Sequence, residues 1–139
     1  MTERVFDQDK LKQYYGKILQ KSEDLKTSAC CCNGDNLSQA VKAALSEIND
    51  EIIITRFYGC GSPLPPLLDG CTVVDLGCGT GRDSYVAARL AGPNGYVIGV
   101  DMTDEQLEVA KRNRDSQMKR FGYKQPNIEF RQGYIENLK

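Results

Sequence analysis

A glycine-rich segment is the part of the sequence whose residue types and spacing point most directly to ligand chemistry. It reads Asp75-Leu76-Gly77-Cys78-Gly79-Thr80-Gly81 and continues a short apolar run that begins at residue 71. Glycines at the carboxyl end of a strand let the backbone turn sharply and approach a ligand that a side chain would keep away. We therefore predict that a ligand binds at Gly77, Cys78, Gly79 and Gly81, with the carboxylate of Asp75 beside it.

The same segment lacks the spacing of a phosphate-binding loop. A dinucleotide-binding fingerprint has its third glycine three residues after the second, and Arg82 occupies that position here. The carboxylate of Asp75 is a poor neighbour for a phosphate but a good one for a cationic amino group. S-adenosylmethionine carries an ammonium group, a carboxylate and a sulfonium but no phosphate, so these residues favour that cofactor.

Further positions extend the predicted site along the same edge. Asp101 ends the second apolar run, where a carboxylate can accept two hydrogen bonds from ribose hydroxyls, and Met102 beside it can pack on an adenine ring. The third run leads into Tyr134 and Ile135, which we expect next along the cleft, against the adenine edge. The alternative is an ordinary tight turn, with the acids as solvated strand ends.

A β-α-β-α-β unit would bring these positions together. Short apolar runs predict buried strands over 71–76, 96–101 and 128–133. Helical periodicity predicts a helix over 82–90, and a longer helix follows the second strand. This order is half of a doubly wound parallel α/β sheet.

Local signals predict where other helices lie and begin. Periodic apolar residues indicate a helix over roughly 11–19, and Ser38 can cap a second one. Thr103 and Gln106 form a capping box at the start of the helix after the second strand. The run Ile52-Ile53-Ile54 either extends the Ser38 helix or forms a short strand, and periodicity does not decide between them.

The stretch YGCGSPLPP separates two parts of the chain, because its glycines and prolines interrupt regular structure. We predict a helical segment with a cysteine loop over 1–62 and a partial Rossmann-like domain over 63–139, truncated soon after its third strand. Eighteen basic and nineteen acidic residues leave a formal net charge of -1, which gives no reason to expect binding to nucleic acid or to a membrane. We expect a cytoplasmic protein, because the sequence shows no signal peptide and no spanning apolar run. We also expect a monomer.

The chain has six cysteines and no histidine, so catalysis must use thiols, carboxylates, phenols or a cofactor. We expect reduced thiols, because nothing indicates secretion. Cys30, Cys31 and Cys32 follow one another on a predicted loop. Zinc binding there is an alternative, although contiguous cysteines do not wrap a tetrahedron as spaced ligands do. We interpret Cys71 and Cys78 as small buried residues with a structural role.

The sequence as a whole resembles the arsenite S-adenosylmethionine methyltransferases, from about Gln13 to the last residue. The most specific pieces of the likeness are Tyr58-Gly59-Cys60-Gly61 and Gly81-Arg82-Asp83, together with the LKTSAC segment that ends at Cys30. The resemblance implies a Rossmann-like S-adenosylmethionine methyltransferase fold with helices before it. It also implies an enzyme that methylates trivalent arsenic with S-adenosylmethionine, of which this chain carries the cofactor-binding half.

The resemblance further implies roles for individual residues. In the family, a cysteine of the TSAC segment and the one in YGCG belong to a set of four that bind arsenite or cycle through a disulfide. Cys60 matches directly, and Cys30 matches by its flanking residues, with the adjacent Cys31 and Cys32 as further candidates. Tyr58 would lie near the sulfonium, where a ring face attracts a cation, or would pack in the core.

The partners implied are arsenite or its thiol conjugates and a thiol reductant, either glutathione or a thioredoxin-like protein. The other two cysteines of the family set are missing from this sequence. We therefore expect the chain alone to bind the cofactor weakly, if at all, and to show no or trace activity. Two alternatives remain: a methyltransferase that acts on another small-molecule acceptor, and a non-catalytic module that holds a metalloid or a cofactor.

Overall fold

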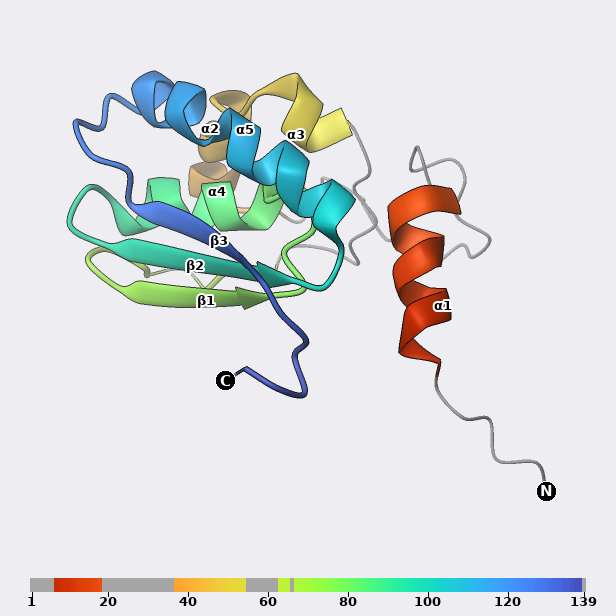
Figure 1. Ribbon diagram of the computed structural model, residues 1–139. Helices are drawn as coiled ribbons and strands as arrows, with labels where there is room; N and C mark the ends of the chain where they lie inside the picture. The colour runs from red at the N-terminus through yellow and green to blue at the C-terminus, as the bar shows by residue number, and fades with distance from the viewer. Residues whose placement is uncertain (1–6, 19–36, 55–62, 66, 139) are drawn as a thin grey trace.

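A parallel three-stranded sheet lies at the centre of the fold. The computed structural model describes residues 7–18, 37–54, 63–65 and 67–138. The strands lie side by side in the order β1 (Thr72–Leu76), β2 (Tyr96–Asp101) and β3 (Ile128–Gln132) (Figure 1). The three predicted strands are confirmed, with nearly the bounds expected from the sequence.

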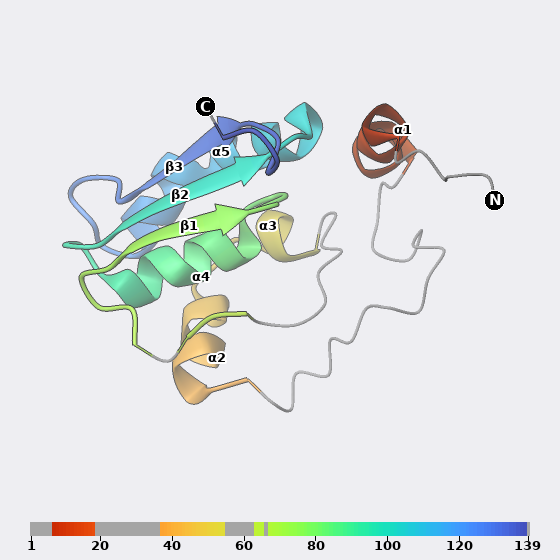
Figure 2. The same ribbon diagram turned by 90° about the horizontal axis from the view of Figure 1, so that it is seen from below.

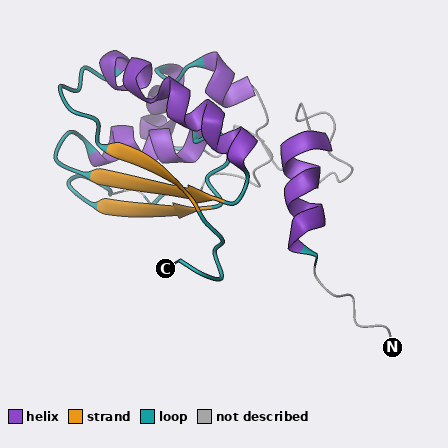
Figure 3. Ribbon diagram, in the orientation of Figure 1, coloured by secondary structure: helices purple, strands orange, loops and turns teal. Residues whose placement is uncertain are grey.

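Two helices connect the strands and cover one face of the sheet. Helix α4 (Arg82–Ala91) joins β1 to β2, and α5 (Asp104–Arg120) joins β2 to β3. Right-handed crossovers that proceed in one direction along a sheet place their helices on the same side. Figure 2 shows both helices on one side of the strands, and Figure 3 separates helices and strands by colour. The predicted β-α-β-α-β unit is confirmed.

The opposite face of the sheet is not covered by any element that the structure describes. Val74 and Leu76 of β1 are 54% and 50% exposed, and Tyr96 of β2 is 38% exposed. The sequence predicts a buried strand here, and that prediction is wrong for β1 in this chain. Apolar composition reports what a strand prefers to contact, whereas burial on both faces needs a second layer of helices.

The core lies between the sheet and its two connecting helices. Tyr85 of α4 is fully buried, with its ring centroid 5.3 Å from that of Phe130 and its hydroxyl donating to the carbonyl of Ala110 at 2.6 Å. This packing requires Gly81, because a Cβ there would come within 2.9 Å of the Phe130 ring. Other fully or nearly fully buried side chains of this core are Val86, Val97, Leu107 and Ile128.

Helix α5 begins at Thr103 as its N-cap, but not through the predicted capping box. The Thr103 side chain makes no capping hydrogen bond. Gln106 instead donates from Nε2 to the carbonyl of Tyr15 at 3.2 Å. The capping-box prediction is therefore wrong, because Gln106 is engaged by a residue 91 positions away, which a local motif does not report.

The amino-terminal segment forms α1 (Gln8–Gln13), followed by a π-helical turn, η1 (Tyr14–Ile18). The helix begins earlier than its apolar periodicity indicates, because Asp7 caps it with Oδ1, which accepts the N–H of Lys10 at 3.1 Å. The helix predicted over roughly 11–19 is confirmed as far as the described residues extend.

Helices α2 (Gln39–Ser46) and α3 (Asp50–Ile54) pack behind the connecting helices. Ser38 caps α2 as predicted, with its Oγ accepting the N–H of Val41 at 3.3 Å. The run 52–54, for which the sequence left helix and strand open, is helical. It belongs to a separate short helix rather than to an extension of α2.

A buried glutamine of α5 fixes the turn between α2 and α3. Gln117 is fully buried, and its Oε1 accepts the N–H of Asn49 at 2.9 Å. Its Nε2 donates to the carbonyl of Glu47 at 2.8 Å. Ile48 and Ile52 belong to the same hydrophobic core as the residues around the sheet. Helices α2 and α3 are thus packed onto the β-α-β-α-β unit.

The predicted division into two parts and the predicted absence of a membrane-spanning segment both concern the chain as a whole. The border predicted between residues 62 and 63 adjoins residues outside the described part of the chain, so the division into two parts stays a prediction. None of the helices that the structure describes is long and apolar enough to cross a membrane.

Candidate functional site

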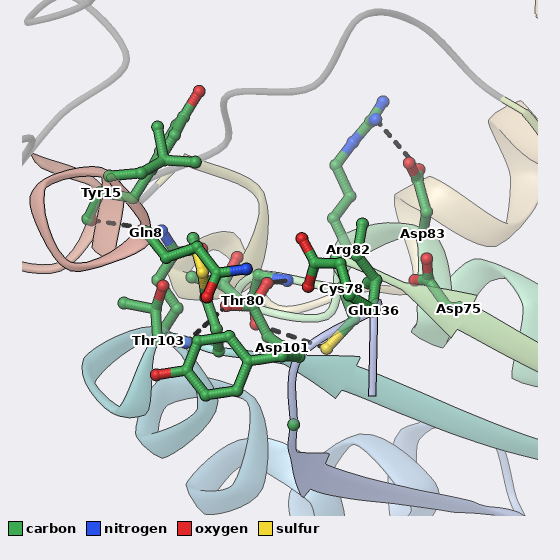
Figure 4. Close-up of a pocket in the computed structure, with 18 residues that line it drawn as sticks. Gln8, Tyr15, Asp75, Cys78, Thr80, Arg82, Asp83, Asp101, Thr103 and Glu136 are labelled. Carbon is green, nitrogen blue, oxygen red and sulfur yellow. Dashed lines mark hydrogen bonds and ion pairs between the residues drawn. The ribbon is translucent and has the colours of Figure 1, made fainter. Parts of the chain in front are cut away.

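A pocket opens at the edge of the sheet where the three strands end. Its volume is about 360 Å³, and its walls come from the segments after β1, β2 and β3 and from the amino-terminal helices (Figure 4). Eight of the residues that the sequence assigns to cofactor binding line this pocket: Asp75, Gly77, Cys78, Gly79, Asp101, Met102, Tyr134 and Ile135. The structure thus brings together residues that come from three separate strand ends.

The glycine segment forms the wall after β1. The N–H groups of Gly77 and Cys78 both donate to the carbonyl of Val100, at 2.7 and 3.0 Å, so the neighbouring strand holds the segment in place. Gly77 and Gly79 have φ values of +79° and +56°, in the left-handed region that favours glycine. A Cβ on Gly77 would meet no atom within 4 Å, so the backbone here faces open space.

Gly81 and Tyr58 are the other two residues that the sequence assigns to cofactor binding. Gly81, the last residue of the glycine segment, is buried and does not line the pocket; it makes room for the rings of Phe130 and Tyr85. Tyr58 lies outside the described residues. So do the cysteines to which the resemblance assigns arsenic chemistry: Cys30, Cys31, Cys32 and Cys60. The roles of Tyr58 and of these cysteines stay predictions.

Asp101 joins two walls of the pocket. Its Oδ2 accepts the N–H of Gly79 at 2.8 Å, and its Oδ1 accepts the N–H of Thr103 at 2.8 Å. The residue is 9% exposed, so these bonds hold the carboxylate in one orientation. A carboxylate oxygen can accept more than one hydrogen bond. The remaining acceptor positions of Asp101 suit a pair of hydroxyl donors.

Asp75 precedes the glycine segment and is hydrogen-bonded by α4. The hydroxyl of Ser84 donates to its Oδ2 at 2.5 Å. Burial raises the pKa of Asp75, the Ser84 hydrogen bond lowers it, and the charge of Asp101 raises it further. A cation beside these two carboxylates would relieve their repulsion, so the electrostatics of this part of the pocket favour a positively charged ligand group.

Arg82 and Asp83 add charges of both signs to the pocket wall at the start of α4. Nη1 of Arg82 lies 3.2 Å from Oδ1 of Asp83, and the two side chains are only 13% and 20% exposed. Burial raises the pKa of Asp83 to about 6, although the Arg82 charge lowers it and the Asp75 charge raises it. The sequence singles out this pair without a site role, and the structure places it at the pocket.

The segment after β3 forms a further wall. The N–H of Gly133 donates to the carbonyl of Asp101 at 3.0 Å, which holds this segment beside the end of β2. Tyr134 forms an isolated bridge with Asn137, and Ile135 is 57% exposed. Together with the partly buried Met102, these side chains give the pocket an apolar end.

Several lining residues were not anticipated from the sequence: Gln8, Leu11, Tyr15, Thr80, Thr103 and Gln106. Thr80 is 3% exposed and donates from Oγ1 to the carbonyl of Ile52 at 3.1 Å, which ties α3 to the glycine segment. A hydroxyl inside the glycine segment was a signal that pointed to such a contact. The amino-terminal residues carried no such signal, because periodicity shows which residues share a helix face but not what that face contacts.

The two described cysteines differ in environment. Cys78 is 8% exposed, and burial raises the pKa of its thiol, with the charges of Asp101 and Asp75 acting in the same direction. Its thiol is therefore protonated at neutral pH, which supports the structural interpretation. Cys71 is exposed, so the interpretation of that residue as buried is wrong. It directly precedes β1.

Comparisons with known proteins agree with this geometry. A family model described as a methyltransferase domain matches residues 67–139. An arsenite methyltransferase of Aquipseudomonas alcaligenes is 52% identical over 130 residues, which are 94% of this chain and 36% of that protein. The arsenite methyltransferase of Homo sapiens is 40% identical over 131 residues, which are 94% of this chain and 35% of that protein.

A solved structure supports the same relationship. The arsenic(III) S-adenosylmethionine methyltransferase of Chlamydomonas reinhardtii matches with a TM-score of 0.68 and 46% identity, over 72% of this chain and 33% of that chain. The chain spans about a third of the length of these relatives. The Rossmann-like S-adenosylmethionine methyltransferase fold and the resemblance to arsenite methyltransferases are both confirmed. The chain belongs to the methyltransferase-domain family, and its sequence matches arsenite methyltransferases over nearly its whole length.

Proposed function

We propose that this chain is the cofactor-binding part of an S-adenosylmethionine-dependent arsenite methyltransferase. The observation that carries the proposal is the carboxylate of Asp101, which lines the pocket at the strand ends and accepts the Gly79 N–H at 2.8 Å. This bond joins the glycine segment to the acid best placed for a ribose. It occurs in a chain that is 52% identical to an arsenite methyltransferase over 94% of its length.

The polar residues of the pocket suit the polar groups of S-adenosylmethionine. The fixed carboxylate of Asp101 would accept the ribose hydroxyls. Asp75 and Asp83 offer negative charge to the ammonium group, and Arg82 offers a guanidinium to the carboxylate of the methionine part. The pairing of two acids with one base on this wall matches an amino acid better than it matches a phosphate.

The apolar residues suit the adenine ring. Met102, Tyr134 and Ile135 line the pocket beside the ends of β2 and β3, where a flat ring would be shielded from water. The space beside Gly77 is open, so the ligand can come close to the backbone where no side chain intervenes. Both features support the fit of this cofactor to the residues present.

S-adenosylmethionine supplies an electrophilic methyl group on a sulfonium, which a trivalent arsenic centre with its lone pair can accept. We propose that Cys60 and Cys30 hold the arsenic, with Cys31 and Cys32 as adjacent candidates, because thiolates bind soft centres. Tyr58 would face the sulfonium. The protein then has to align two centres rather than to move protons, a task that needs no histidine.

The remaining partners follow from the thiol chemistry. We propose arsenite or its thiol conjugates as the substrate, and glutathione or a thioredoxin-like protein as the reductant that returns oxidised cysteines to thiols. We propose a cytoplasmic location, where thiols stay reduced, and a monomeric state. One face of the sheet is uncovered in the described part of this chain, so we expect weak cofactor binding and no or trace turnover by this chain alone.

A titration of the reduced, isotope-labelled protein with S-adenosylmethionine tests the cofactor assignment. We expect amide chemical-shift changes at Gly77, Gly79 and Thr103, and we expect Asp101→Ala to abolish them. Asp115→Ala is the matched control, because Asp115 is a 74% exposed acid of α5 that does not line the pocket. No change at these amides in the wild-type protein would contradict the assignment.

Addition of As(III) to the same samples tests the substrate. We expect new shifts at Cys60 and in the Cys30 loop, and we expect Cys60→Ser to remove those at residue 60 and its neighbours. Cofactor binding without any response to As(III) would instead favour a methyltransferase for another acceptor.

A further inference from the structure

The pocket does not end at the sheet, because the amino-terminal helices form one of its walls. Gln8 and Leu11 of α1 and Tyr15 of η1 line it together with residues that follow the strands (Figure 4). Their spacing of three and then four positions puts them on one face of a helix. One face of this segment is therefore turned to the pocket.

Polar contacts hold this wall against the start of α5. Nε2 of Gln106 donates to the carbonyl of Tyr15 at 3.2 Å. Nζ of Lys12 lies 3.4 Å from Oδ2 of Asp104. Asp104 and Gln106 both lie in the first turn of α5, which follows Asp101 and Met102 after the N-cap residue Thr103. The helix is thus docked beside the proposed ribose site.

Gly16 lies close against the start of α5. A Cβ at this position would lie 2.7 Å from Oε2 of Glu105 and 3.0 Å from Cγ2 of Thr103. The Glu105 side chain can rotate away, but Thr103 is 1% exposed and is confined by its neighbours. The docking therefore depends on a residue without a side chain.

Lys12 connects the same helix to the wall after β3. Its Nζ lies 5.9 Å from the centroid of the Tyr134 ring, within the range of a cation–π interaction. The Lys12 side chain is 27% exposed, so this contact is partly shielded from water. The amino-terminal segment thus contacts both walls that the proposed function assigns to the nucleoside.

We propose that the cofactor site includes the amino-terminal helix, with Leu11 and Tyr15 covering the adenosine half of bound S-adenosylmethionine. This inference rests on the proposed function, because it takes the pocket to bind that cofactor. The helix docks next to Asp101 and Tyr134, which are the residues assigned to ribose and adenine. An aliphatic side chain and an aromatic ring in this place remove apolar surface of the nucleoside from water and so strengthen its binding.

Two substitutions test this inference in different ways. Leu11→Ala removes an apolar lining group and leaves the docking contacts in place, whereas Gly16→Val forces the helix away from Thr103. For each we expect the dissociation constant of S-adenosylmethionine, measured by chemical-shift titration, to rise on the order of tenfold. Gln13→Ala is the matched control, since Gln13 is exposed on the same helix, and should change that constant by less than about twofold.

The amide signals of Thr103 and Gln106 in the cofactor-free protein report docking separately from binding. Gly16→Val should shift these signals, and Gln13→Ala should not. If Leu11→Ala and Gly16→Val both bind the cofactor as tightly as wild type while Asp101→Ala does not bind it, the helix is no part of the site and the proposed function stands. If the wild-type protein shows no binding that depends on Asp101, the proposed function fails and this inference fails with it.

Discussion

The acidic side chains of the pocket are placed where ionisation is costly. Burial raises the pKa of Asp83 to about 6 and also raises the pKa of Asp75. Arg82 opposes this effect at Asp83 but does not overcome it. Such an arrangement is typical of binding sites, where a charged group is kept desolvated for a ligand at the expense of stability. The free energy of unfolding should therefore depend on pH.

Replacement of Asp83 by Asn should stabilise the protein at neutral and basic pH. The ordinary pKa of the carboxyl is 3.8, and the folded value is about 6. Between these values the folded state binds more protons than the unfolded state, so this group lowers the stability as pH rises through the window and keeps it lower above. We expect Asp83→Asn to add roughly 1 to 3 kcal/mol to the unfolding free energy at about pH 8.

Urea denaturation at basic pH and below the ordinary pKa of 3.8 measures this effect. The gain from Asp83→Asn should disappear at the acid pH, where Asp83 is neutral in both states. Asp115→Asn, at an exposed position, is the control and should be nearly neutral throughout. An equal gain for Asp83→Asn at both pH values would contradict the assigned pKa.

The site residues that could be predicted are those that lie at the end of a strand or directly follow it. Asp101 and the glycine segment were found because parallel sheets bind ligands at the carboxyl ends of their strands, which the sequence pattern locates. Gly81 shows the limit of this reasoning. In the sequence it looks like Gly77 and Gly79, yet it packs against Phe130, a residue of a distant strand. That contact is tertiary and leaves no trace in the local spacing.

At the scale of elements, contacts between segments that are far apart in the sequence decide what the local pattern leaves open. The run 52–54 is helical, and Thr80 donates to the carbonyl of Ile52. The expected capping box fails because Gln106 bonds to Tyr15. Strands and long helices were predictable from their periodicity, whereas the docking of the amino-terminal helix was not, because it depends on partners far along the chain.

Replacement of Gln117 by Ala should weaken the attachment of α2 and α3 to α5. The change removes two hydrogen bonds and leaves the N–H of Asn49 and the carbonyl of Glu47 without these partners. We expect a loss of about 2 to 4 kcal/mol in the free energy of unfolding by urea. Gln125→Ala, at an exposed position, should cost less than about 0.5 kcal/mol. A loss for Gln117→Ala no larger than for this control would show that the two bonds contribute nothing.

At the scale of the whole molecule, the sheet is covered on one face only by the described residues (Figure 2). The half of the fold that periodicity predicts is present, with both crossover helices on the covered face. Strand composition did not reveal whether the other face is buried, because apolar residues such as Val74 and Leu76 occur equally in a strand whose two faces are both covered. Their exposure leaves apolar surface in contact with water.

A double substitution on this face should change surface properties without much change in stability. Val74→Thr with Leu76→Thr puts β-branched residues, which favour strands, at both positions of β1 and removes exposed apolar surface. We expect less fluorescence from the apolar dye ANS and a change in unfolding free energy within about 1 kcal/mol. Val97→Thr, on the buried side of β2, should cost more stability. Unchanged dye binding in the double variant would show that the dye reports another surface.

The central claim is that this pocket binds a nucleoside cofactor that has no phosphate. The most direct test is an equilibrium titration of the wild-type protein and of Asp101→Asn with S-adenosylmethionine and, separately, with NAD. We predict that S-adenosylmethionine binds the wild-type protein, that NAD does not, and that Asp101→Asn weakens S-adenosylmethionine binding by about tenfold or more. Binding of NAD as tight as that of S-adenosylmethionine, or no effect of Asp101→Asn, would contradict the claim.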